Sequence, residues 1–103
     1  NERWQRVVSH VNSDNPSDWR QAIIEADVML EEYLRTAGYH GDSIGDMLKA
    51  VEPGEIQNIR AAWDAHMVRN RIAHDGGDFQ LTDREAKRVV TLFEQVFREV
   101  DII

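Results

Sequence analysis

The sequence predicts an all-α protein, an up-and-down bundle of four or five helices. Apolar residues recur at three- and four-residue spacing along most of the 103 residues, which is the period of an amphipathic helix. Helix start and stop signals separate these segments, and no segment shows the alternation of polar and apolar residues that is typical of a strand. The connections are short, as expected for helices that run antiparallel to their neighbours. The length allows one hydrophobic core, so we expect a single domain over residues 1–103.

The first two helices are predicted before Gly38. The first has one apolar face, made of Trp4, Val7, Val8 and Val11. It ends near Asn12, and the second helix begins at Asn15, an N-cap residue followed by Pro16 at the first helical position. A long apolar stripe follows, made of Trp19, Ile23, Ala26, Leu30, Tyr33 and Ala37.

A short third helix, capped by Asp42 or Ser43, precedes the break at Pro53-Gly54, and a fourth helix is expected from about Glu55 to Ala73. This fourth helix has two apolar stripes on roughly opposite sides. One is made of Ile56, Ile59, Trp63, Met67 and Asn70, and the other of Ala61, Ala65, Val68 and Ile72. A helix that is apolar on two sides should be the central helix of the bundle.

The last helix opens with Thr82-Asp83-Arg84-Glu85, which matches the capping box S/T-x-x-E. Its apolar stripe is unbroken and consists of Ala86, Val89, Val90, Phe93, Val96, Phe97 and Val100. In the loop before it, Phe79 and Leu81 are expected to contact the core. We also expect all three tryptophans in the core, because each lies at helical spacing within an apolar stripe.

The end of the fourth helix concentrates polar chemistry. Arg69 to Asp75 holds two arginines, an amide, an imidazole and a carboxylate, and Gly76-Gly77 follows as a stop signal. The order Arg69-Asn70 followed by His74 resembles the R-x4-H signature of the HEPN superfamily (higher eukaryotes and prokaryotes nucleotide-binding). That superfamily favours a polar residue directly after the arginine, and Asn70 fits. The resemblance covers most of the chain in its helical architecture, but only Arg69 to His74 in its motif.

The resemblance implies a metal-independent endoribonuclease whose composite site forms when two such motifs meet in a homodimer. The 2′-hydroxyl of RNA is then the nucleophile. His74 would transfer a proton near neutral pH, and Arg69 would stabilise charge on the phosphate with its planar fork of donors. Asn70 would orient the histidine or hold the phosphate. Arg71 lies outside the family's motif, and we expect it to be a second, substrate-binding phosphate contact.

The spacing of the motif creates a geometric difficulty. On a continuous helix Arg69 and His74 point about 140° away from each other. They converge only if the helix loosens before His74, or if the arginine acts across a dimer interface. A structural role is an open alternative, because Asn70 and His74 lie near a core-facing stripe and could form hydrogen bonds inside the bundle.

The charge and the missing motifs exclude several classes of function. The net charge is −7, and only residues 57–88, with six basic and five acidic side chains, are not acidic. Most of the surface should repel a polyanion, so we expect RNA to bind only locally at the motif, and we expect no DNA binding. There is no cysteine, no phosphate-binding loop and no nucleophile elbow, and the spacing of His66 and His74 is poor for a metal. We therefore expect neither a metal nor a cofactor.

The sequence also gives expectations about where in the cell the chain lies. No apolar run approaches the roughly 20 residues that span a bilayer, and no signal peptide opens the chain. We therefore expect a cytoplasmic segment without membrane contact. Because the chain begins with Asn1 rather than Met, we expect a domain excised from a longer protein, which could carry a membrane anchor.

The alternative to the ribonuclease is a non-catalytic helical module that dimerises or docks a partner. The acidity favours this alternative, whereas the intact motif favours the enzyme.

Overall fold

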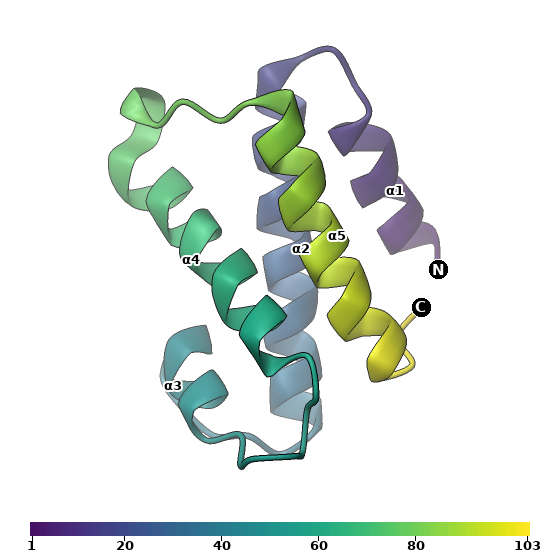
Figure 1. Cartoon of the computed structure of the whole chain (residues 1–103), viewed down its shortest axis with the longest axis vertical. Helices are drawn as coiled ribbons and strands as arrows, with labels where there is room; N and C mark the ends of the chain where they lie inside the picture. The colour runs from purple at the N-terminus through teal and green to yellow at the C-terminus, as the bar shows by residue number, and fades with distance from the viewer.

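The computed structural model describes all 103 residues, which form a bundle of five α-helices without strands (Figure 1). The elements are α1 (Glu2–Val11), α2 (Pro16–Thr36), α3 (Ile44–Lys49), α4 (Ile59–Asp75), the 3-10 turn η1 (Gly76–Asp78) and α5 (Asp83–Glu99). The predicted all-α bundle of four to five helices is thereby confirmed. None of the helices combines the length and the apolar character needed to cross a bilayer.

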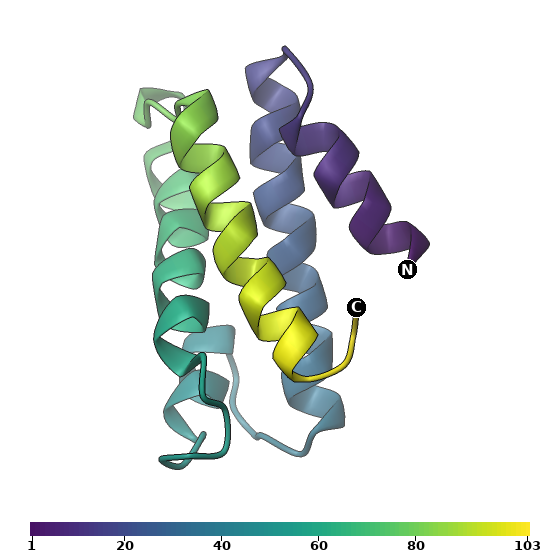
Figure 2. The same ribbon diagram turned by 45° about the vertical axis from the view of Figure 1, so that its right-hand side comes forward.

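The helix at the centre of the bundle is α2. It packs against α1, α3, α4 and α5, whereas α4 packs against α2, α3 and α5 but not against α1. Figure 2 shows α2 with α1 on one side and with α4 and α5 on the other. The prediction that the fourth helix is central is therefore wrong.

Only one of the two apolar stripes of α4 is buried, which is why the helix lies at the outside. The buried stripe is made of Ala61, Ala65, Val68 and Ile72. The other stripe opens to solvent along the helix: Ile59 and Trp63 are half-buried, Met67 is 51% exposed, and Asn70 is exposed. The helix also begins at Ile59 rather than near Glu55, and it continues to Asp75.

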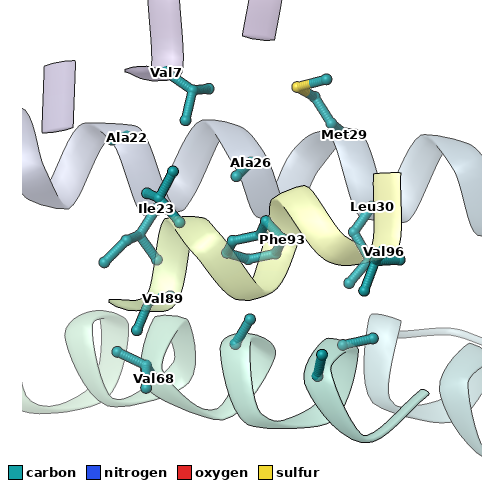
Figure 3. Close-up of a cluster of buried hydrophobic side chains, with 14 of the residues drawn as sticks. Val7, Ala22, Ile23, Ala26, Met29, Leu30, Val68, Val89, Phe93 and Val96 are labelled. Carbon is teal, nitrogen blue, oxygen red and sulfur yellow. The ribbon is translucent and has the colours of Figure 1, made fainter. Parts of the chain in front are cut away.

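The core is one cluster of 25 buried hydrophobic residues, and its centre lies between α2, α4 and α5. Figure 3 shows Phe93 of α5 among side chains from α2 and α4. Phe93 stacks on Phe97 with ring centroids 5.9 Å apart, and Trp4 meets Phe97 edge-on at 5.5 Å. Trp4 is buried as expected. Trp19 and Trp63 are only half-buried, so the prediction that all three tryptophans are core is wrong for these two.

The start of α4 is held by a residue from another helix. Its N-cap residue, Asn58, makes no side-chain capping hydrogen bond. Instead the carboxylate of Glu99, at the end of α5, accepts hydrogen bonds from the backbone N–H of Gln57 (2.6 Å), the backbone N–H of Asn58 (2.8 Å) and Asn58 Nδ2 (2.8 Å). A carboxylate at this position also complements the positive end of the helix dipole. Burial raises the pKa of Glu99, but the three hydrogen bonds outweigh burial, and the net pKa of Glu99 is lowered.

We predict that Glu99→Gln lowers the free energy of unfolding by about 1–2 kcal/mol at pH 7. A carboxyl group with a lowered folded-state pKa stabilises the fold above its unfolded pKa, and this stabilisation is lost as the pH falls through the folded-state pKa. The difference between wild type and Glu99→Gln should therefore shrink as the pH falls below the ordinary glutamate value of 4.5. Urea unfolding at a series of pH values measures it.

Glu94→Gln is the matched control on the same helix. Glu94 forms an exposed pair with Arg98 one turn away, and such pairs contribute little. It should change the free energy of unfolding by less than about 0.5 kcal/mol at pH 7. Equal losses in the two variants would show that Glu99 is no special cap of α4.

Candidate functional site

Two polar residues are buried in the bundle, Asp27 of α2 and His66 of α4, and they face each other. His66 Nδ1 lies 3.1 Å from both carboxylate oxygens of Asp27. Asp27 lies within the apolar stripe of α2, between Ile23 and Leu30, so its carboxylate has no access to water. Because burying a charge is costly unless the charge is paired, this contact constrains how α4 lies against α2.

Two residues of the R-x4-H motif are joined to this buried pair. Arg69 Nε lies 3.5 Å from Asp27 Oδ2, and the arginine side chain is 35% exposed. One edge of the guanidinium is therefore anchored at the carboxylate, while the rest reaches solvent. Asn70 Nδ2 lies 3.3 Å from His66 Nε2, and Asn70 is exposed. Asp27, His66, Arg69 and Asn70 thus form one polar cluster, which we call the Asp27 cluster.

His74 stands apart from the Asp27 cluster. It lies in the last turn of α4, is exposed, and its side chain makes no hydrogen bond or ion pair. Of the two residues that could have a structural role, Asn70 forms a hydrogen bond to buried His66, whereas His74 forms none. Since α4 stays a regular helix as far as Asp75, it does not loosen before His74. Arg69 and His74 of one chain thus point about 140° apart, and an interface between two chains remains the route by which they could meet.

Arg71 belongs to a different part of the surface. Its guanidinium lies 4.6 Å from the centre of the Phe79 ring, and its Nε lies 3.9 Å from Asp75 Oδ2. With Asp78 and Glu85, among others, these residues line an open cleft of about 400 Å³. Three carboxylates around one arginine weaken its attraction for a phosphate. The expected role of Arg71 as a second phosphate contact stays a prediction.

No set of three or more histidine, aspartate and glutamate side chains gathers to hold a metal ion. His66 is buried against α2, whereas His74 is exposed. Among the groups that reach solvent, the imidazole of His74 is of a type that transfers protons near neutral pH, and the guanidinium of Arg69 is of a type that binds anions.

Neither the buried position of Asp27 nor a site role for His66 was predicted from the sequence. One signal pointed to Asp27, because it lies four residues after Ile23 and three before Leu30, inside an apolar stripe. A carboxylate at such a position needs a partner. The sequence did not show that His66 and Arg69, about forty residues away along the chain, supply it.

The chain matches no protein-family model, no curated protein and no solved structure. The resemblance to the HEPN superfamily therefore rests on Arg69, Asn70 and His74 and on their place near the end of a long helix.

We predict very different effects on stability when each of the two histidines of α4 is replaced by alanine. His66→Ala leaves Asp27 buried without its main hydrogen-bond partner and should lower the free energy of unfolding by about 3–5 kcal/mol. His74→Ala removes an exposed side chain without partners and should change it by less than about 0.5 kcal/mol. Thermal and urea unfolding measure both. A large loss in His74→Ala would contradict the exposed position of His74.

Proposed function

We propose that the domain works as a homodimer in which two R-x4-H motifs form one metal-independent site that cleaves RNA. The observation that supports this is the contrast within the motif. Arg69 is anchored by a buried carboxylate, whereas His74 is exposed and unpaired on another side of an unbroken helix. These two groups suit a phosphodiester reaction, but one chain does not bring them together. A second copy does so when its His74 approaches Arg69.

In the proposed reaction the 2′-hydroxyl of a nucleotide attacks the adjacent phosphorus, and the 5′-oxygen of the next nucleotide leaves. The products are a 2′,3′-cyclic phosphate and a free 5′-hydroxyl. A neutral His74 takes the proton of the 2′-hydroxyl, and a protonated His74 from the other subunit gives a proton to the leaving oxygen. Arg69 donates charge-assisted hydrogen bonds to the phosphate oxygens, where negative charge develops.

A non-catalytic dimerisation module is the second candidate, and the exposed face of α4 favours it. Met67, 51% exposed, lies opposite the buried side of the helix, given about 100° per residue. Arg60 and Asp64 precede it on the same face, and Arg71 and Asp75 follow it. If two α4 helices pack antiparallel with Met67 near the two-fold axis, Arg60 meets Asp75 of the second copy and Asp64 meets Arg71 of the second copy. Such self-complementary charge suits a two-fold interface.

The two candidate dimers place His74 differently. In the antiparallel α4 dimer the two His74 residues lie about 20 Å apart along the helix axes, given a rise of 1.5 Å per residue. That distance is too long for them to act on one phosphate. In the composite-site dimer the ends of the two α4 helices approach each other, and the two histidines share one groove. The separation of the two His74 residues therefore distinguishes the ribonuclease from the dimerisation module.

We predict that the wild-type protein cleaves single-stranded RNA in excess EDTA and leaves a 2′,3′-cyclic phosphate. His74→Ala should lower kcat/KM by about 10²–10⁴-fold without changing the melting temperature, because it removes the proton-transfer group. Arg69→Ala should lose more activity than Arg69→Lys, which keeps the charge but loses the planar fork. Single-turnover cleavage of a labelled RNA, with the products resolved by mass spectrometry, measures these effects.

Two controls sharpen this experiment. His40→Ala removes an exposed histidine outside the motif and should keep wild-type activity. An RNA with a 2′-deoxy group at the cleaved position lacks the nucleophile and should stay intact. Cleavage that persists in His74→Ala, or a dimeric wild type that cleaves no RNA, would overturn the proposed ribonuclease.

A further inference from the structure

We propose that Asp27 and His66 are positioning residues that set the orientation of the Asn70 amide, so that Asn70 Oδ1 points outwards and accepts a hydrogen bond from the ring N–H of His74. The result is a relay from the buried carboxylate to the exposed imidazole. Its catalytic consequence rests on the proposed ribonuclease, whereas the arrangement of hydrogen atoms within the Asp27 cluster does not.

The first step is the tautomer of His66. Its Nδ1 lies 3.1 Å from both oxygens of Asp27, and an ionised carboxylate can only accept hydrogen bonds. Nδ1 must therefore carry a proton. Arg69 Nε lies 3.5 Å from Oδ2 of the same carboxylate and supplies the positive charge that an ionised Asp27 needs as its partner.

The second step is the charge of His66. Arg69 already balances the negative charge of Asp27, so a neutral imidazole leaves the Asp27 cluster electrically balanced. An imidazolium would add an unbalanced positive charge to a side chain that is only 8% exposed. A neutral His66 with its proton on Nδ1 has a bare Nε2, which acts as an acceptor.

The third step follows for Asn70. The group 3.3 Å from His66 Nε2 must be a donor, so the Asn70 amide turns its Nδ2 towards His66. Its Oδ1 then faces away from His66, at the exposed surface of α4. Asn70 thus presents an acceptor to the outside. An acceptor suits a ring N–H rather than a phosphate oxygen, so the outward Oδ1 favours the histidine-orienting role over the phosphate-holding role for Asn70.

The donor that this acceptor meets is His74. Asn70 and His74 are four residues apart on a regular helix, so they are neighbours on its surface. The exposed His74 ring makes no hydrogen bond in the structure, and in the proposed relay one of its N–H groups donates to Asn70 Oδ1. Binding there fixes which ring nitrogen carries the proton. The other nitrogen is then free to accept the proton of the 2′-hydroxyl.

The direct test is the tautomer of His66, read from long-range ¹H–¹⁵N correlation spectra of the protein with ¹⁵N-labelled histidine. We expect a neutral His66 protonated on Nδ1 in the wild type at pH 7. In Asp27→Asn the new amide can donate to Nδ1, so the proton should move to Nε2. A wild-type His66 that is protonated on Nε2, alone or together with Nδ1, overturns the proposal. This measurement does not depend on cleavage of RNA.

The catalytic consequence is tested with Asp27→Asn and Asn70→Ala. Asn70→Ala should lower kcat by up to about 100-fold and leave KM unchanged, because it misorients His74 without removing a phosphate contact. Asp27→Asn should lower kcat similarly and also raise KM, because it removes the charged anchor of Arg69 as well. A rise in KM with kcat unchanged in Asn70→Ala would show that Asn70 holds the phosphate and would overturn the relay. Asp14→Asn, an exposed aspartate between α1 and α2, is the matched control and should change neither constant. If the wild type cleaves no RNA, the proposed ribonuclease fails, and the tautomer of His66 still decides the orientation of Asn70.

Discussion

A carboxylate inside a hydrophobic bundle has to be paired, and the pairing of Asp27 determines how α4 lies against α2. Both partners of Asp27, His66 and Arg69, come from α4. This contact selects which side of α4 faces the core, since a rotated helix would leave the buried charge alone. Buried ion pairs add little net stability compared with apolar packing, so we regard the main contribution of Asp27 as the orientation of α4. Arg69 is held at the rim of the bundle, and Met67 and His74 face solvent, as a consequence.

This constraint also explains which features the sequence could predict. The helices α2 and α5 were predictable because their caps at Asn15 and Thr82 and their single apolar stripes are local signals. The position of α4 was not predictable, because this helix has apolar residues on two sides and the periodicity does not show which side is buried. The deciding contact comes from Asp27, 39 residues before His66 in the chain. The motif of Arg69, Asn70 and His74 could be recognised because its residues are close together in the sequence. The Asp27 cluster could not, because it forms only when the chain folds.

The same contact has two effects on the chemistry of Arg69. Its charge is partly neutralised by Asp27, which weakens long-range attraction of a polyanion to a chain whose net charge is already −7. In return the guanidinium is held in place, so binding of a phosphate, as we propose, would cost less side-chain entropy. A site of this kind suits one phosphate presented at close range better than non-specific binding along a nucleic acid. The proposed ribonuclease and the alternative dimerisation module would both use a second copy of the chain, and they would differ in which residues of α4 meet.

Subunit complementation tests directly whether Arg69 and His74 act together only across a dimer, as we propose. Arg69→Ala and His74→Ala proteins, each inactive alone, are mixed after unfolding and refolding so that heterodimers form. Each heterodimer holds an intact Arg69 on one chain and an intact His74 on the other. A composite site predicts that RNA cleavage in the mixture rises above that of either variant, in proportion to the heterodimers measured by native mass spectrometry. Cleavage stays below that of the wild type, because each heterodimer keeps only one of the two His74 residues. A mixture that contains heterodimers but is no more active than its two components, beside an active wild type, would contradict a composite site.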